Sequence, residues 1–213
     1  MLMSYLLHID SSALGDASVS RQVAQSFLEE WDGAVVHRDL ATTPVPHLDS
    51  AGITARETDP AEHTEEQAAA AALQGELIDE FVNASAYLYT VPMYNLTMPS
   101  VFKAWLDQVV VVGRTVRPAP AAGRPAVLIS ARGGSYGPEA PYHGFDYVVP
   151  TLEAILGRAE LLSLDVATVV PELTLAPHTP SMAPLLPKHA ASMAEAHDRA
   201  RHLATALTTR VAA

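Results

Sequence analysis

Small hydroxyl residues cluster in the first polar stretch of the chain, where their chemistry suits phosphate binding. The stretch runs from Asp10 to Ser20, carries hydroxyls at Ser12, Ser18 and Ser20, and leads into a helix-like segment. Free N–H groups and the positive end of the helix dipole favour an anion at such a helix N-terminus. Because serine donors are uncharged, we predict a phosphate pocket that needs no buried cation. A solvated loop with a serine cap is the simpler alternative.

Two further polar stretches also follow apolar runs. One extends from Pro92 to Pro99 and places Tyr94 and Asn95 where nothing apolar need be buried. The other begins at Ala131 and is rich in glycine. No Gly-x-Gly-x-x-Gly follows the first apolar run and no Gly-Lys-Ser/Thr occurs, so the sequence has neither a dinucleotide fingerprint nor a P-loop.

The chain contains no cysteine, which excludes thiolate nucleophiles, disulfides and Cys-ligated metal centres. Redox chemistry would therefore need a cofactor. Among the histidines, His197 and His202 are five residues apart, a spacing that does not put both on one helix face, and no His-Glu-x-x-His motif occurs. We predict no metal site.

The glycine-rich stretch also matches the Gly-x-Ser-x-Gly elbow of α/β-hydrolases, with Ser135 as the candidate nucleophile. An elbow requires a sharp turn directly into a helix. Pro138 and Pro141 follow too closely for such a helix, and the chain leaves little room for the larger hydrolase sheet. We keep the hydrolase as a minor alternative.

Five apolar runs alternate with amphipathic segments, a pattern typical of βαβ units in a parallel sheet covered by helices on both faces. The strands are expected at residues 5–9, 34–37, 86–91, 126–130 and 161–169. This predicts a flavodoxin-like, doubly wound α/β fold with strand order 2-1-3-4-5. Ligands of such sheets bind beyond the carboxyl ends of strands one, three and four.

The segments between the strands carry helix signals. The first helix should bury apolar residues at helical spacing, namely Val23, Ala24, Phe27, Leu28 and Trp31. Thr64 and Gln67 form a capping box that opens a helix to about residue 81. Further helices are expected after Pro99, over residues 147–156, and from Pro187 to Val211. The connection up to residue 64 is long, which is typical of a functional or disordered segment.

The composition indicates one domain, residues 1–213, with a sizeable core, since 49% of the residues are hydrophobic. The net charge of −11 argues against a nucleic-acid partner. No window approaches the roughly 20 apolar residues of a membrane span. The N-terminus lacks a basic region and its apolar run stops at Asp10, so we expect a strand there and a cytoplasmic protein.

A distinctive pattern follows the third apolar run: Pro92-Met93-Tyr94-Asn95, then Pro99, Lys103, Trp105, Asp107 and Gly113. It resembles the FMN-dependent NADH-azoreductase family, close kin of the flavodoxin-like NAD(P)H:quinone reductases. The likeness covers most of the chain. It extends to Asp10-Ser11-Ser12, Arg38-Asp39-Leu40, Pro44-Val45-Pro46 and Arg132-Gly133-Gly134.

The resemblance implies three groups of residues that bind flavin mononucleotide (FMN). A phosphate loop would use Ser12, Ser18, Val19 and Ser20; a ring-edge loop Met93, Tyr94, Asn95 and Leu96; and a pyrimidine loop Ala131, Arg132, Gly133 and Gly134. Glycine suits close backbone approach to the ring. Substrate-pocket candidates are Tyr136, His143 and Phe145. Leu96 and Ala131 depart from the family pattern, which usually has phenylalanine and serine there, and this leaves the acceptor open.

The implied function is an FMN-dependent NAD(P)H oxidoreductase that reduces quinones, azo compounds or a related conjugated acceptor. Our hypothesis is a ping-pong, two-electron hydride transfer in which flavin N5 carries the chemistry and no protein residue acts as nucleophile. NADH or NADPH would be the donor. A homodimer is implied, with the helix after Pro99 as the candidate contact. The alternative is a flavodoxin-like electron carrier, which would need neither the long connection before residue 64 nor the extra C-terminal helix.

Overall fold

The computed structural model describes residues 4–212 and contains a five-stranded parallel sheet. The strands are β1 (Tyr5–Asp10), β2 (Ala34–Asp39), β3 (Ala86–Thr90), β4 (Pro125–Ile129) and β5 (Asp165–Val169). Their order is β2-β1-β3-β4-β5, and every neighbouring pair is parallel. The predicted fold class and strand order are confirmed.

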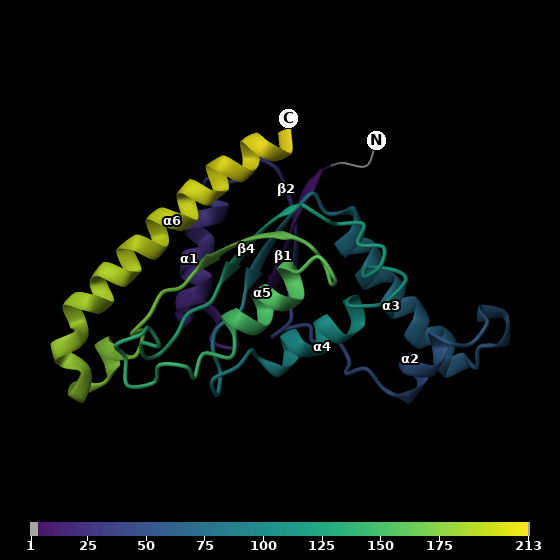
Figure 1. Cartoon of the computed structure of the whole chain (residues 1–213), viewed down its shortest axis with the longest axis horizontal. Coiled ribbons are helices and arrows are strands. Elements are labelled where there is room, and N and C mark those ends of the chain that lie inside the picture. Colours follow the sequence, from purple (N-terminus) through teal and green to yellow (C-terminus); the bar gives the residue numbers. More distant parts are fainter. Residues whose placement is uncertain (1–3, 213) are drawn as a thin grey trace.

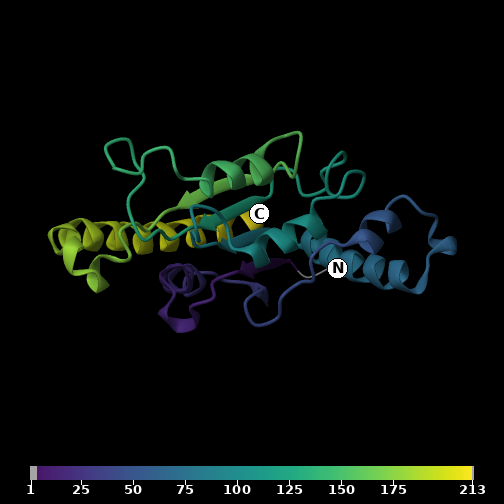
Figure 2. The same ribbon diagram turned by 90° about the horizontal axis from the view of Figure 1, so that it is seen from below.

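Helices cover both faces of this sheet (Figure 1). They are α1 (Val19–Leu28), α2 (Ser50–Ala55), α3 (Glu65–Asn83), α4 (Ser100–Val109), α5 (Val149–Gly157) and α6 (Leu186–Ala212). In Figure 1, α1 and α6 lie to the left of the sheet and α3 to its right. Seen from below, the start of α6 lies at the left end of the molecule and α3 toward its right end (Figure 2). Within residues 4–212, no helix is both long and apolar enough to cross a membrane.

The sequence of each strand reflects its place in the sheet. Strands β3 and β4 are buried along their whole length, and β1 from its second residue on. Helices cover both faces of these central strands, so both sets of alternating side chains are mostly apolar. The buried exceptions are His8, Asp10 and Thr90. The edge strands β2 and β5 are only partly buried.

The alternation of side chains along the strands creates two separate cores. Leu7 of β1 and Tyr87 of β3 belong to the core beneath α3, α4 and α5, which also holds the packed rings of Phe102 and Trp105. Leu6 belongs to the other core, beneath α1 and α6. On that side α6 presents small residues at every fourth position, Ala196, Ala200 and Ala204, which lets the long helix approach the sheet and α1 closely.

The predicted helix signals act as expected at two positions. Thr64 accepts a hydrogen bond from the Gln67 N–H at 3.2 Å, and the Gln67 side chain accepts one from the Thr64 N–H at 2.9 Å, which completes the capping box. Pro99 is the N-cap of α4. Its missing N–H costs nothing there, because the first amides of a helix have no partner inside the helix.

Two predicted boundaries are wrong. The fifth strand was expected over residues 161–169 but begins at Asp165, because the preceding leucines form a turn in which Ser163 has φ +59°. Leu162 and Leu164 are buried from that turn, which explains their strand-like pattern. Trp31 was expected on the first helix but follows its end at Leu28, and its ring stacks on Phe27 with centroids 6.0 Å apart.

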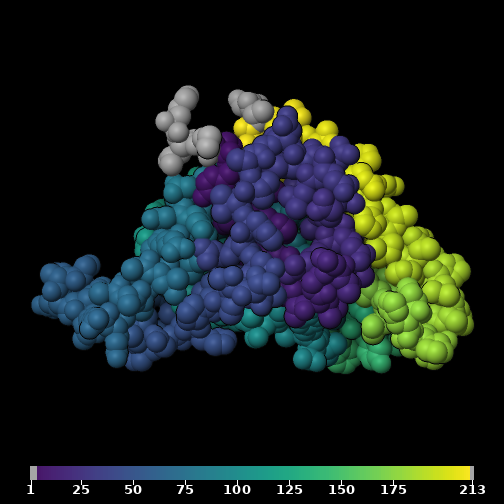
Figure 3. Space-filling view, turned by 180° about the vertical axis from the view of Figure 1, so that it is seen from behind, coloured from purple at the N-terminus to yellow at the C-terminus, as the bar shows by residue number. Residues whose placement is uncertain are grey.

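The long connection before residue 64 is an ordered excursion rather than a plain loop. It contains α2 and a short 3-10 helix (Pro60–Glu62), neither of which the sequence predicted. Arg56 fixes it to the body of the molecule by donating to the Asp107 carbonyl at 2.8 Å and to Gln74 Oε1 at 3.2 Å. The excursion projects from one end of the molecule (Figure 3).

Candidate functional site at the carboxyl edge of the sheet

The three predicted binding loops start at one edge of the sheet and are joined by backbone hydrogen bonds. This edge faces the bottom of Figure 1. The Ser11 N–H donates to the Thr90 carbonyl at 3.0 Å, which joins the chain after β1 to the end of β3. The Met93 N–H donates to the Ala131 carbonyl at 2.9 Å. The structure therefore brings the phosphate, ring-edge and pyrimidine loops together.

The phosphate loop is buried and rich in unused donors. Ser12, Ser18 and Ser20 each expose 1% or less of their surface. Ser18 is the N-cap of α1 and accepts from the Arg21 N–H at 3.2 Å, and its hydroxyl lies 3.1 Å from that of Ser20. In the described chain, the backbone N–H groups of Val19 and Ser20 have no acceptor. A phosphate oxygen fits these orphan donors of the first turn.

Arg21, a cation next to the phosphate loop, is paired inside the protein. Its guanidinium lies 2.8 Å from Asp10 and 2.9 Å from Asp39, and it donates to the Ser12 carbonyl at 2.9 Å. Burial acts to raise the pKa of Asp39, but hydrogen bonds from Arg21 and from the Ala41 N–H outweigh it and lower the pKa. Arg21 is thus paired with two strand ends, while the free donors in the first turn of α1 are neutral amides.

The ring-edge loop is a tight turn with an unusual backbone. Asn95 and Leu96 have φ values of +50° and +70°, and Tyr94 and Thr97 exchange N–H to carbonyl hydrogen bonds of 2.8 and 3.1 Å across them. Asparagine tolerates this left-handed region, whereas leucine there costs about 1 kcal/mol. The turn leaves the N–H groups of Asn95 and Leu96 without an acceptor among residues 4–212.

Tyr94 joins the ring-edge loop to the phosphate loop, a role that the sequence did not reveal. Its hydroxyl accepts from the Ala13 N–H at 3.1 Å and lies 3.4 Å from the Ser12 hydroxyl. Met93, which precedes it, is half-buried against the larger core. The aromatic side chain therefore lies along the edge of the candidate site.

The pyrimidine loop is held through its carbonyls, which leaves amides free. The carbonyls of Gly133 and Gly134 accept from Leu175 and Leu173 at 3.3 and 3.0 Å. Across residues 4–212, nothing accepts from the N–H group of either glycine. A Cβ on Gly133 would lie 2.7 Å from the end of the Leu175 side chain, which is 54% exposed and would have to move aside.

The Arg132 side chain supports the site from within the protein. Its guanidinium is 1% exposed, donates to the Ser130 carbonyl at 2.8 Å and forms an ion pair with Asp146. Asp146 also accepts from the N–H groups of Val148 and Val149 at 3.0 and 3.2 Å, at the start of α5. An aspartate just before a helix with proline in its first turn is a capping signal that we missed.

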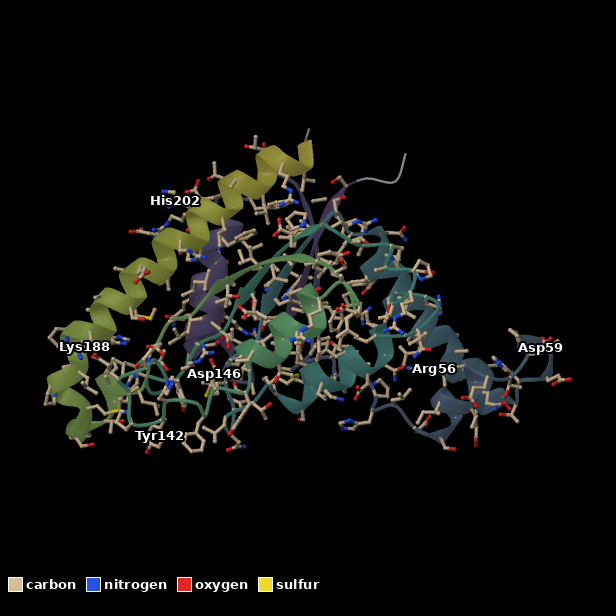
Figure 4. All side chains as sticks on the ribbon, in the orientation of Figure 1. Arg56, Asp59, Tyr142, Asp146, Lys188 and His202 are labelled. Atoms are coloured by element: carbon tan, nitrogen blue, oxygen red, sulfur yellow. The ribbon has the colours of Figure 1, made fainter. Side chains whose placement is uncertain are left out.

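A cavity of about 760 Å³ opens beside the pyrimidine loop. It lies between residues 134–142 and residues that include Leu173, Met182 and Lys188. Tyr142 and Lys188, both labelled in Figure 4, lie at the same end of the molecule.

The three predicted substrate-pocket residues lie on the same loop but do not line that cavity. The Tyr136 ring packs against Tyr142 with centroids 6.1 Å apart, while His143 and Phe145 are exposed.

The hydrolase alternative lacks its geometry. The Ser135 hydroxyl donates to Glu172 at 2.9 Å, so it pairs with a carboxylate rather than a histidine. The same carboxylate accepts from the Tyr136 N–H at 3.1 Å. No helix follows the serine until α5 begins at Val149, across a stretch that the structure describes completely. Ser135 therefore anchors the loop and is not a nucleophile.

Comparison with known proteins agrees with this arrangement. A family model described as a flavodoxin-like fold matches residues 4–175. The chain belongs to the flavodoxin-like fold family. Within that family, an FMN-dependent NADH:quinone oxidoreductase of Streptomyces coelicolor is 45% identical, over 99% of this chain and 98% of that protein. The FMN-dependent NADH:quinone oxidoreductase 2 of Trichormus variabilis is 44% identical, over 73% of this chain and 81% of that protein.

Solved structures of the flavodoxin-like family share the fold. An FMN-dependent NADH-azoreductase from Bacillus anthracis, in complex with FMN, superposes with a TM-score of 0.80 at 23% identity, covering 96% of this chain and 99% of that one. An NAD(P)H:quinone oxidoreductase from Methanothermobacter marburgensis gives a TM-score of 0.68 at 15% identity, covering 96% and 97%. The resemblance inferred from Pro92 to Asn95 is confirmed.

Replacing Asp146 with asparagine should strongly destabilise the protein. The change leaves the buried Arg132 charge without its partner, which costs about 3 kcal/mol of unfolding free energy. Urea denaturation measures the loss. The matched control is Asp198→Asn, whose ion pair with Arg201 lies on the surface and should matter by less than about 0.5 kcal/mol. Equal, small losses in both variants would contradict the role of Asp146.

Proposed function

We propose that this chain is an FMN-dependent NADH:quinone oxidoreductase that acts as a single FMN-binding domain. The observation that carries the proposal is the set of unpaired backbone donors at the carboxyl edge of the sheet. They come in three pairs, from Val19 and Ser20, Asn95 and Leu96, and Gly133 and Gly134. Relatives that are 45% identical over nearly the whole chain carry this name, which supports the same conclusion.

Each of the three donor pairs would serve a different group of acceptor atoms on FMN. The first turn of α1, with the hydroxyls of Ser12, Ser18 and Ser20, would hold the phosphate. An N–H from the Asn95–Leu96 turn would donate to N5, and the amides of Gly133 and Gly134 would donate at N1 and O2. Met93 and Tyr94 would border the ring, and Ala131 and Arg132 would place the two glycines.

Bound FMN would supply the redox chemistry, taking a hydride from NADH and returning two electrons to the acceptor in a ping-pong cycle. The protein would supply position and a partial positive charge where the ring gains electrons. Leu96 is 36% exposed and would face a flat quinone or azo acceptor. Its side chain would offer the acceptor a smaller apolar surface than the phenylalanine usual in the family. Tyr136, His143 and Phe145 would close over that acceptor from the loop after β4.

The direct test is to add FMN to the purified protein and follow NADH oxidation with a quinone. We expect a yellow complex with bound-flavin absorbance and quinone-dependent turnover of NADH. An electron carrier such as flavodoxin would bind FMN but oxidise almost no NADH with a quinone. Failure to retain FMN would overturn the whole proposal. FMN binding without NADH oxidation would overturn only the proposed enzymatic activity.

Replacing Ser12 with alanine should weaken FMN binding by about tenfold, because it removes one hydrogen bond to a charged phosphate worth about 1.5 kcal/mol. Fluorescence titration measures the affinity. Riboflavin, which lacks the phosphate, is the matched control ligand and should bind the variant and the parent protein equally well. If both ligands lose affinity to the same extent, Ser12 does not contact the phosphate.

We further propose that the protein is a cytoplasmic homodimer with α4 at the contact. Large apolar side chains are exposed near the site, including Tyr142, Phe145 and Leu175, and a second copy would cover them. Light scattering at low concentration should give twice the mass of one chain. A single-chain mass would exclude the dimer without affecting the proposed FMN site.

A further inference from the structure

Two histidines and an aspartate meet on the α1 side of the sheet, outside the proposed FMN loops. His8 and Asp10 lie on β1, and His37 lies on β2 directly opposite His8 in the strand register. One ligand atom from each of the three side chains lies within 4.8 Å of the other two. Residues 8 and 37 are distant in sequence, so spacing along the chain gave no sign of this cluster.

The cluster borders a cavity. A space of about 630 Å³ opens between α1 and the edge strand β2, and its lining includes all three residues. Both elements lie on the face seen in Figure 3. Because His37 is exposed while His8 and Asp10 are buried, the cluster has an inner wall of fixed groups and an outer group that faces solvent.

The two inner groups are already positioned as ligands. His8 Nε2 lies 2.8 Å from the Thr90 hydroxyl, and if Nε2–H donates there, Nδ1 keeps its lone pair. A second hydrogen bond of this kind orients most metal-binding histidines. Asp10 accepts from the Ser12 N–H at 3.0 Å and faces Arg21 at 2.8 Å. Each carboxylate oxygen has two lone pairs, so both oxygens keep one for an ion.

The outer group can complete the set. The rings of His8 and His37 are stacked with centroids 4.6 Å apart. Ligands of one zinc ion lie about 3.3 Å from each other, since the bonds are about 2.0–2.1 Å long. Stacked rings cannot both aim a nitrogen at one ion, so His37 must turn, and its exposed position leaves room to do so.

The surrounding charges allow a divalent cation. Arg21 is the cation closest to Asp10, and it is also bound to Asp39 at 2.9 Å. Two carboxylates and one guanidinium give a local charge of −1 when the histidines are neutral.

We propose that His8, Asp10 and His37 form a binding site for one divalent transition-metal ion of the zinc class. Two imidazoles and one carboxylate are a ligand set of zinc and related ions, whereas magnesium and calcium prefer oxygen ligands. The remaining coordination positions open into the cavity beside α1. The site is separate from the proposed FMN site, although Asp10 joins the two through its hydrogen bond with Ser12.

Calorimetric titration of the full-length, FMN-loaded protein with Zn²⁺ tests the site. We expect one ion per chain, and His37→Ala should weaken its binding by at least about tenfold, the loss that even outer-shell partners cause. His37 is exposed, so its replacement should leave the fold intact. His202→Ala is the matched control, because this exposed histidine lies on α6 and is not part of the cluster. The His202→Ala protein should bind Zn²⁺ as tightly as the parent protein.

A spectroscopic readout identifies the ligands. With Cu²⁺ as the probe, electron paramagnetic resonance should show coupling to two imidazole nitrogens in the parent protein and to one in His37→Ala. Mg²⁺ in large excess should not displace Zn²⁺. The proposal is overturned by the absence of Zn²⁺ binding, by an equal loss in His37→Ala and His202→Ala, or by a Cu²⁺ spectrum that His37→Ala does not change.

Discussion

The hydrogen-bond ladder of the parallel sheet continues past the ends of its strands, and the candidate site depends on that continuation. The Leu40 N–H donates to the Asp10 carbonyl at 2.8 Å, and the Val91 N–H donates to the Ile129 carbonyl at 2.9 Å. The chain after β4 is fixed in the same way, because the Arg132 N–H donates to the Pro171 carbonyl at 2.9 Å. Each binding loop therefore leaves the sheet from a fixed point, and only the amides beyond that point remain free to bind a ligand.

Buried and half-buried charged side chains hold these starting points of the loops in place. Arg21 binds the phosphate loop to two strand ends, Arg132 binds the pyrimidine loop to the start of α5, and Glu172 binds the following loop through Ser135. Each of these charged groups is paired with an opposite charge or a polar group of the protein. Charged side chains thus hold the loops, while neutral backbone amides stay free for a ligand. This arrangement is physically reasonable, since an oriented neutral amide binds an anion without the cost of burying an unpaired charge.

The sequence predicted the fold and the points where the three loops leave the sheet, because both depend on local patterns. Buried central strands such as β3 read as continuous apolar runs, and the capping box at Thr64 marks its helix directly. Side-chain partners distant along the chain left no such pattern. The contacts from Tyr94 to Ala13 and from Arg132 to Asp146 arise only when the strands pair. The turn before β5 was misread because buried leucines look alike in a strand and in a packed turn.

Under the proposed function, the left-handed backbone at Leu96 would link stability and substrate selectivity in a single residue. Glycine at this position would relax the turn and add about 1 kcal/mol to the free energy of unfolding. Under the proposed function, the same exchange would strip the side chain that faces the acceptor. A laboratory selection for heat resistance would therefore favour glycine at position 96 and a broader substrate range. A selection for a narrow substrate range would keep Leu96 and its strained backbone.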